Sequence, residues 1–220
     1  MGTGNYSPST ARVYTDFSYL TDAVDLGEDG TDLFNYLTVY SEQEKYHGLL
    51  VAPLTLRERL AHLIREQRER AEKRQPACTT CKTKALTDPK IIEELYLASQ
   101  FGVKVELIIR GICCLKPGLV EISENIRVVS LVGRFLEHAR AFAFGEGEDE
   151  KIYLGSADLM QRNLDRRVET LFPLCEALHR EKVRRLFDLQ IADTVNTWEL
   201  NADGSYTHLC PYEGEKSLDS

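Results

Sequence analysis

One histidine carries the strongest chemical signal in the sequence. His138 lies in the segment Phe135-Leu-Glu-His-Ala-Arg140, directly before an apolar run. A histidine can attack phosphorus, or act as general acid or base, near neutral pH. A lone histidine is more often structural than catalytic, so spacing alone leaves both interpretations open. The other four histidines lie in stretches typical of helices or of a tail, where we expect surface positions: His47, His62, His179 and His208.

Arginines concentrate around this histidine. Six of them fall between residues 127 and 167: Arg127, Arg134, Arg140, Arg162, Arg166 and Arg167. Phosphoryl transfer depends mostly on positioning and on charge neutralisation, so such a group is typical of a phosphate site. Acidic residues gather elsewhere, notably at 146–150, which is compatible with a positive pocket on an acidic chain. The alternative for any single arginine is an ordinary solvated surface position.

A tetrad of small and polar residues occurs twice. Gly2-Thr-Gly-Asn5 and Gly155-Ser-Ala-Asp158 both fit the pattern G-[ST]-x-[ND]. An acidic residue follows eleven positions after each, Asp16 after the first and Glu169 after the second. Small residues let backbone N–H groups approach a phosphate, and the Ser156 hydroxyl adds a donor. Two such loops facing each other would form one site at a pseudo-two-fold axis, and two unrelated glycine turns are the alternative.

Composition excludes several classes of protein. The net charge of -8 over 220 residues argues against a general nucleic-acid binder. No apolar run is long enough to span a membrane, and the first residues do not read as a secretion signal, so we expect a cytoplasmic location, free or in a membrane-associated complex. Cys78 and Cys81 have the spacing of a zinc or redox motif but lack two further ligands at suitable spacing, so no metal site is predicted.

The hydrophobic pattern predicts strands alternating with helices. Strands are expected over 12–20, 49–54, 77–83, 103–109, 126–131, 139–144, 151–154 and 166–172. Helices are expected over 31–40 with Thr31 or Asp32 as cap, from a Thr55/Glu58 capping box, from Asp88-Pro89 to Gly102, and through Leu178, Val183, Leu186, Phe187 and Ile191. This alternation predicts an α/β fold with a mixed β-sheet flanked by helices.

Eight segments, read in order, resemble the C-terminal catalytic portion of the polyphosphate kinase family. They are Gly2-Thr-Gly-Asn-Tyr6, Thr10-Ala-Arg-Val-Tyr-Thr-Asp16, Asp32-Leu-Phe-Asn-Tyr-Leu37, Ile109-Arg-Gly-Ile-Cys-Cys-Leu115, Ser123-Glu-Asn-Ile-Arg127, Val132-Gly-Arg-Phe-Leu-Glu-His138, Tyr153-Leu-Gly-Ser-Ala-Asp158 and Arg162-Asn-Leu-Asp-Arg-Arg-Val-Glu169. The resemblance runs over most of residues 2 to 195, and no clear correspondence is seen beyond about residue 198.

The resemblance implies a phospholipase D-like fold with two domains. Residues 1–47 would be the C-terminal remnant of the first catalytic domain and should pack poorly, and residues 48–220 would be the second. The implied reaction is reversible, magnesium-dependent transfer of the terminal phosphate of ATP to inorganic polyphosphate through a phosphohistidine, in an enzyme that is a homo-oligomer at full length. That phosphohistidine would lie upstream of this chain, so the isolated chain is expected to be inactive.

Site residues follow from the same resemblance. Tyr14, Arg110 and His138 match the ATP-binding residues, and His138 would act as acid, base or phosphate ligand. Weaker candidates for phosphate contact are Arg134, Arg140, Arg166, Arg167 and Ser156. The sequence departs from the family at Lys84, where the family usually has asparagine, and at Leu159 and Gln161. Two other functions remain open, a phospholipase D-like phosphodiesterase and a non-catalytic module that binds ATP or polyphosphate.

Overall fold

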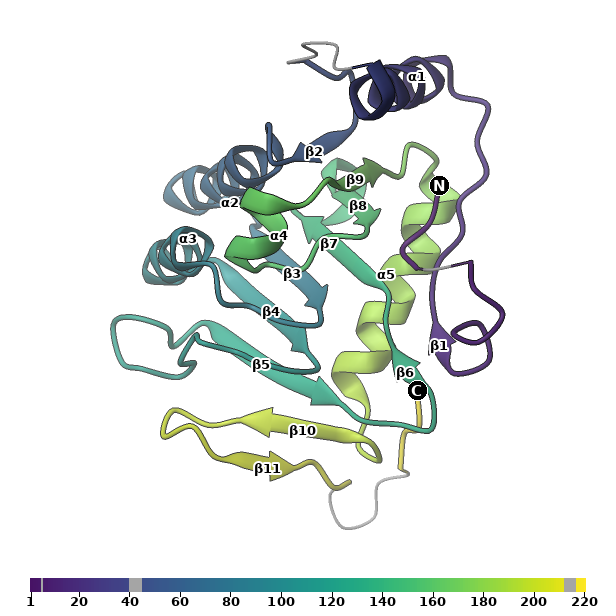
Figure 1. The fold of residues 1–220 in the computed structure, drawn as a ribbon. Coiled ribbons are helices and arrows are strands. Elements are labelled where there is room, and N and C mark those ends of the chain that lie inside the picture. The colour runs from purple at the N-terminus through teal and green to yellow at the C-terminus, as the bar shows by residue number, and fades with distance from the viewer. Residues whose placement is uncertain (5, 40–44, 212–216) are drawn as a thin grey trace.

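A computed structural model describes residues 1–4, 6–39, 45–211 and 217–220 (Figure 1). Its centre is a mixed sheet with the strand order β11-β10-β5-β4-β3-β7-β8-β9-β2. Helices lie on both faces of this sheet, so the prediction of an α/β fold with a flanked mixed sheet is confirmed. Among the described residues, none of the helices combines the length and the apolar character needed to cross a membrane.

The direction of the strands reverses at the centre of the sheet. The strands are β2 (Leu50–Ala52), β3 (Cys78–Thr83), β4 (Lys104–Ile109), β5 (Ile126–Leu131), β7 (Arg140–Phe144), β8 (Lys151–Gly155), β9 (Glu169–Pro173), β10 (Thr197–Leu200) and β11 (Tyr206–His208). β3, β4 and β5 run parallel, whereas β7 runs antiparallel to β3. A separate parallel pair consists of β1 (Tyr14–Thr15) and β6 (Leu136–Glu137).

Helices close two apolar cores against the sheet. They are α1 (Val24–Val39), α2 (Leu56–Glu72), α3 (Pro89–Gln100), α4 (Gln161–Arg166) and α5 (Ala177–Ala192). The core under α2 and α3 includes Leu63, Leu107 and Phe142. The core under α5 includes Phe187 and also takes in side chains from the N-terminal segment, which runs beside α5 in Figure 1.

Local signals placed α3 correctly but misplaced the start of α1 and predicted a capping bond at α2 that is not formed. Asp88 accepts a hydrogen bond from the backbone N–H of Ile91 at 3.1 Å and so caps α3. The helix expected from residue 31 begins at Val24 instead, and its expected last residue, 40, lies outside the described residues. The expected capping box at Thr55 is wrong, because that hydroxyl accepts from Val51 N at 3.3 Å and does not cap α2.

Two strand predictions also need correction. The strand expected over 12–20 is reduced to β1, Tyr14–Thr15. The stretch 166–172 is divided, because α4 runs through Arg166 and β9 begins at Glu169. The pairs that involve β6, β10 and β11 were not predicted.

The expectation that residues 1–47 pack poorly is wrong for their inner face. Tyr19 and Leu26 are buried in the core under α5. Asp29 is fully buried, and its carboxylate accepts hydrogen bonds of 2.7 to 2.8 Å from three successive backbone N–H groups, at 47, 48 and 49. The outer face of α1 remains exposed at Val24, Phe34 and Leu37.

Candidate active site

Strand direction reverses between β3 and β7, so the ends of several strands lie at one edge of the sheet. β3 and β4 end at this edge because they run in parallel, and β7 begins there because it is antiparallel to β3. In the next pair, Arg140 at the start of β7 lies opposite Gly155 at the end of β8. The segment before β7 and the loop after β8 therefore meet, and these are the segments that contain His138 and Asp158.

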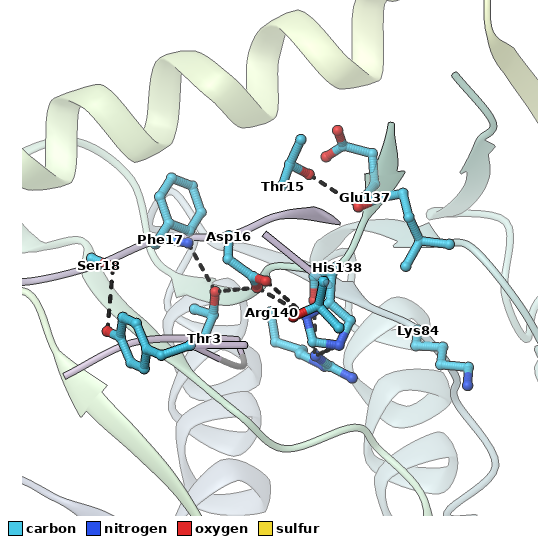
Figure 2. Close-up of polar contacts among 12 residues, drawn as sticks. Thr3, Thr15, Asp16, Phe17, Ser18, Lys84, Glu137, His138 and Arg140 are labelled. Atoms are coloured by element: carbon cyan, nitrogen blue, oxygen red, sulfur yellow. Dashed lines mark hydrogen bonds and ion pairs between the residues drawn. The ribbon is translucent and has the colours of Figure 1, made fainter. Parts of the chain in front are cut away.

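His138 is oriented by a carboxylate from the N-terminal segment. Its Nδ1 lies 2.9 Å from Oδ1 and 3.1 Å from Oδ2 of Asp16 (Figure 2). A carboxylate can only accept, so Nδ1 carries the proton and the lone pair of the neutral ring lies on Nε2. The ring of Tyr14 stacks on the imidazole with 4.7 Å between ring centroids. His138 is thus a half-buried side chain whose Nε2 holds the lone pair of the neutral ring.

Arg140 connects this imidazole to a buried carboxylate. One terminal nitrogen, Nη1, lies 2.9 Å from Nε2 of His138 and donates to the His138 carbonyl at 2.9 Å. On its other side, Nε and Nη2 donate to Oδ1 and Oδ2 of Asp158 at 3.0 and 3.2 Å. This forked pairing fixes the plane of the guanidinium as a single hydrogen bond would not.

Asp158 holds the group together through several hydrogen bonds. Besides Arg140, its Oδ1 accepts from the Thr83 hydroxyl and from the Lys84 backbone N–H, each at 3.0 Å. Burial acts to raise the pKa of this carboxyl, but Arg140 and the hydrogen bonds outweigh it and hold the pKa below its usual range. Asp158 therefore remains charged and serves to position Arg140.

The two tetrads form the same local structure. In the first, Thr3 N donates to Phe17 O at 3.0 Å and Phe17 N donates to the Thr3 hydroxyl at 2.9 Å. In the second, Ser156 N donates to Thr170 O at 3.0 Å and Thr170 N donates to the Ser156 hydroxyl at 3.3 Å. The two tetrads therefore repeat in structure as well as in sequence. Asn5 of the first tetrad lies outside the described residues. Asp16 and Glu169 directly precede Phe17 and Thr170.

Close packing explains the glycines of these loops. A Cβ on Gly155 would lie 2.0 Å from the carbonyl oxygen of Thr170, and one on Gly4 would lie 1.9 Å from the Asp16 carboxylate. Both distances are far inside van der Waals contact. The glycines are needed because a neighbouring segment passes too close for a side chain. The Ser156 N–H and hydroxyl are both engaged with Thr170, so this part of the loop is committed to the sheet.

Arg110 lies at the same edge, directly after β4. Its backbone N–H donates to Thr83 O at 3.4 Å, and Gly111 N donates to Lys84 O at 2.8 Å, which continues the parallel pairing past the strand ends. The Arg110 Nε is buried and has no hydrogen-bond partner among the described residues. Lys84 is exposed, and its side chain extends away from His138 (Figure 2). Two cations with unused donors thus stand beside the His138 group.

The remaining arginine candidates lie apart from this group. Arg134 is exposed, with its guanidinium 5.5 Å from the ring centroid of Phe135. Arg166 and Arg167 are exposed at the end of α4, where Arg167 lies 3.9 Å from Glu169. Among the described residues, none of the three contacts His138 or Asp158.

The described residues do not form a metal site. No group of three or more histidine, cysteine, aspartate or glutamate side chains among them could hold an ion. Cys78 and Cys81 are buried free thiols, and burial raises the pKa of Cys81 to about 12. The carboxylates of Asp16 and Asp158 are already engaged by His138 and Arg140. We therefore assign no residue of this chain to magnesium.

Comparison with known proteins identifies the family. The model of polyphosphate kinase C-terminal domain 2 matches residues 49–220, and that of C-terminal domain 1 matches residues 1–43. The chain belongs to the polyphosphate kinase family. The family match reaches residue 220, so the expectation that correspondence ends near residue 198 is wrong.

Two polyphosphate kinases illustrate the similarity. That of Synechocystis is 46% identical over 220 residues, which is 100% of this chain and 30% of the relative. That of Prosthecochloris aestuarii is 48% identical over 209 residues, which is 95% of this chain and 29% of the relative. The chain thus spans about 30% of the length of these polyphosphate kinases.

Solved structures agree with the family. The crystal structure of polyphosphate kinase from Porphyromonas gingivalis matches all of this chain and 34% of that chain, with a TM-score of 0.94 and 33% identity. A phospholipase D family member, Nuc from Salmonella typhimurium, matches 64% of this chain and 92% of that chain, at a TM-score of 0.47 and 13% identity. The second likeness is too weak to carry an argument.

Proposed function

We propose that this chain supplies one half of a centre that moves the terminal phosphate of ATP to inorganic polyphosphate and back. The line of contacts Asp16–His138–Arg140–Asp158 supports this proposal most directly, because it presents a basic imidazole nitrogen beside a fixed guanidinium. The names of the relatives support it independently. Phosphoryl transfer needs positioning and charge neutralisation, and this group offers both.

His138 would act on the transferred phosphate without carrying it. The lone pair on its Nε2 would take up a proton and return it during the transfer, and Arg140 would neutralise charge beside it. Arg110 would bind the nucleotide phosphates through its unused donors, and Lys84 extends this positive edge. The Tyr14 face turned away from His138 would receive the adenine. Arg134, Arg166, Arg167 and Ser156 remain weaker proposals for phosphate contact.

The repeat suggests where the phosphorylated histidine belongs. Asp16 orients His138, and Glu169 occupies the equivalent position after the second tetrad. We therefore assign to Glu169 the orientation of a second histidine, supplied by chain outside these 220 residues. Its lone pair would attack the γ-phosphorus, the bond to the β-phosphate oxygen would break, and ADP would leave. A terminal polyphosphate oxygen would then attack the phosphorus and release the histidine.

The domain organisation, oligomeric state, location and use of magnesium are part of the same proposal. Residues 1–47 would complete a first catalytic domain and 48–220 would form the second, within a homo-oligomer in the cytoplasm. Magnesium would enter with the nucleotide, with its ligands outside this chain. The 220 residues alone would bind ATP or polyphosphate weakly and would not elongate polyphosphate.

A single comparison tests the proposed function. The full-length protein is assayed for magnesium-dependent polyphosphate synthesis from ATP, and for ATP formation from polyphosphate and ADP. His138→Ala should lower both rates at least about a hundredfold, as loss of an acid or base group does. The matched control is His62→Ala, which removes an exposed histidine on α2 that pairs with Glu66. An unchanged rate in His138→Ala would falsify the proposed role.

Phosphohistidine detection separates the alternatives. The kinase should accumulate an acid-labile phosphohistidine with ATP, and His138→Ala should still form it, because His138 is not the phosphorylated residue. A phosphodiesterase would instead hydrolyse diester substrates, and a binding module would show affinity with no turnover. Robust polyphosphate synthesis by the 220 residues alone would contradict the assignment of the nucleophile to a second histidine.

A further inference from the structure

A buried ion pair lies one residue away from His138 and has no part in the mechanism above. Lys82 on β3 and Glu137 on β6 are joined by a short hydrogen bond, with 3% and 17% of their side chains exposed. The Lys82 ammonium also donates to the Gln190 side-chain oxygen at 2.9 Å. The Gln190 amide donates to Glu137 Oε2 at 2.9 Å, which closes a triangle across β3, β6 and α5.

Charges are costly at such a position. Burial opposes the charged form of Glu137, but Lys82 and the surrounding hydrogen bonds outweigh it and hold the pKa of this carboxyl below its usual range. Removing one partner of a buried pair leaves the other charge uncompensated, whereas replacing both partners by groups of similar shape can be tolerated. The triangle is therefore a fixed connection rather than a fluctuating surface pair.

The strand that precedes His138 depends on this connection. Among the described residues β6 pairs with β1 alone, over two residues, and so short a ladder cannot hold its own position. The same ladder carries Tyr14 on one strand and ends at Asp16 and His138. Glu137 is the side chain that attaches β6 to the main sheet and to α5.

We infer that Lys82 and Glu137 are positioning residues, which hold β6 so that His138 keeps its hydrogen bond to Asp16. Neither side chain contacts the His138 ring, so both act through the strand. The inference rests on the proposed function only where activity is concerned. It also assigns α5 a role at the site, through Gln190.

Other charged side chains also act on Lys82. Besides Glu137, its ammonium is attracted by Asp16 and repelled by Arg110. Glu137→Gln removes the charged partner that connects Lys82 to β6, so it should loosen β6 and with it the contact of His138 with Asp16. The added Lys82→Met change removes the rest of the connection and should not restore that contact.

The test follows the Nδ1 proton of His138 by NMR in ¹⁵N-histidine-labelled protein, with the resonance assigned by its loss in His138→Ala. Wild type should show a downfield Nδ1–H signal protected by Asp16. This signal should weaken or disappear in Glu137→Gln, and the added Lys82→Met change should not restore it. The control is Arg184→Met, which breaks the pair of Arg184, in the middle of α5, with Glu150, directly before β8. It should destabilise the fold without changing the signal.

Two results would overturn the inference. One is a protected Nδ1–H signal that persists unchanged in Glu137→Gln, and the other is an equal loss of the signal in Arg184→Met. In the protein as made in the cell, Glu137→Gln should lower kcat by up to about a hundredfold, as misplacement by a fraction of an ångström to 1 Å does, with little change in KM for ATP. Absence of phosphotransfer in wild type would refute the proposed function and leave the NMR result intact.

Discussion

The Asp16 carboxylate accepts a 2.9 Å hydrogen bond from His138, although 122 residues separate them along the chain. The N-terminal segment thus supplies a carboxylate to a group whose other members lie at the edge of the main sheet. Because the carboxylate fixes the tautomer of the imidazole, the chemistry of Nε2 depends on a residue of the N-terminal segment.

Asp16→Asn should therefore lower activity severely while preserving the fold. An asparagine amide can donate to Nδ1, which favours the tautomer that places the proton on Nε2 and removes the lone pair there. We expect at least about a hundredfold loss of kcat, as for other wrong-tautomer variants. Steady-state phosphotransfer assays measure this, and Asp22→Asn, an exposed acid of the same segment, should be neutral. Equal rates in the two variants would refute the tautomer argument.

Folding stability should fall in acid because of Asp158. Burial acts to raise its pKa, but Arg140 and the hydrogen bonds hold it below 3.8 in the folded state. The unfolded chain therefore takes up this proton at higher pH than the folded chain. The stabilisation is full above the unfolded pKa and is lost in acid, as pH falls through the lowered pKa of the folded state. Urea unfolding across the acid pH range should show the decrease.

Removing the Asp158 charge provides the check on that slope. Asp158→Asn should flatten the acid limb of the stability curve and should lower stability at neutral pH by about 3–5 kcal/mol, because Arg140 then loses its buried partner. Asp22→Asn should leave both the slope and the neutral value unchanged. A slope that survives in Asp158→Asn would mean that other carboxylates carry the acid sensitivity.

Gly155→Ala should destabilise the protein, because its Cβ would lie 2.0 Å from the Thr170 carbonyl oxygen. Overpacking of this kind costs about 1–3 kcal/mol. Gly27→Ala on α1 is the matched comparison, since no atom lies within 4 Å of the added Cβ. There the exchange should stabilise by up to about 1 kcal/mol, through helix propensity. Thermal and urea unfolding measure both, and equal effects would contradict the close approach at Gly155.

The six cysteines should divide by reactivity. Burial raises the pKa of Cys81 to about 12 and also raises that of Cys78, so neither thiol forms a reactive thiolate near neutral pH. Cys114, Cys175 and Cys210 are exposed. At pH 8, iodoacetamide followed by peptide mass mapping should label the exposed three in native protein, and should label Cys78 and Cys81 only after unfolding. Native labelling of Cys81 would refute its burial.

The sequence predicted the parts of the fold that have local causes. Asp88 before Pro89 marks a helix start, and alternation from Val103 to Ile109 marks a buried strand, and both are present. The start of α1 was missed because Gly27 and Gly30, which disfavour helices, lie within it. β6, β10 and β11 are short, and β6 and β10 also pair with strands that are distant in sequence, so no local pattern identifies them.

The site was only partly accessible from the sequence, for the same reason. Spacing singled out His138, and the repeat singled out Asp16 and Glu169 by their equal offsets, but no spacing rule connects Asp16 with His138. Lys82 is marked in the sequence by its charge alone, within a strand whose other residues are buried. Glu137 and Gln190, its partners, lie 55 and 108 residues away and became visible only in three dimensions.

The pairing of β1 with β6 has a consequence for the order of folding. During synthesis Tyr14 and Asp16 leave the ribosome long before Leu136 and His138, so their strand has no partner and the Asp16 carboxylate remains in water. The helix that carries Gln190 is made later still. The centre can therefore close only after this helix and the sheet that supports it have been made, and a mutation that slows docking of the N-terminal segment would delay activity without changing the sheet.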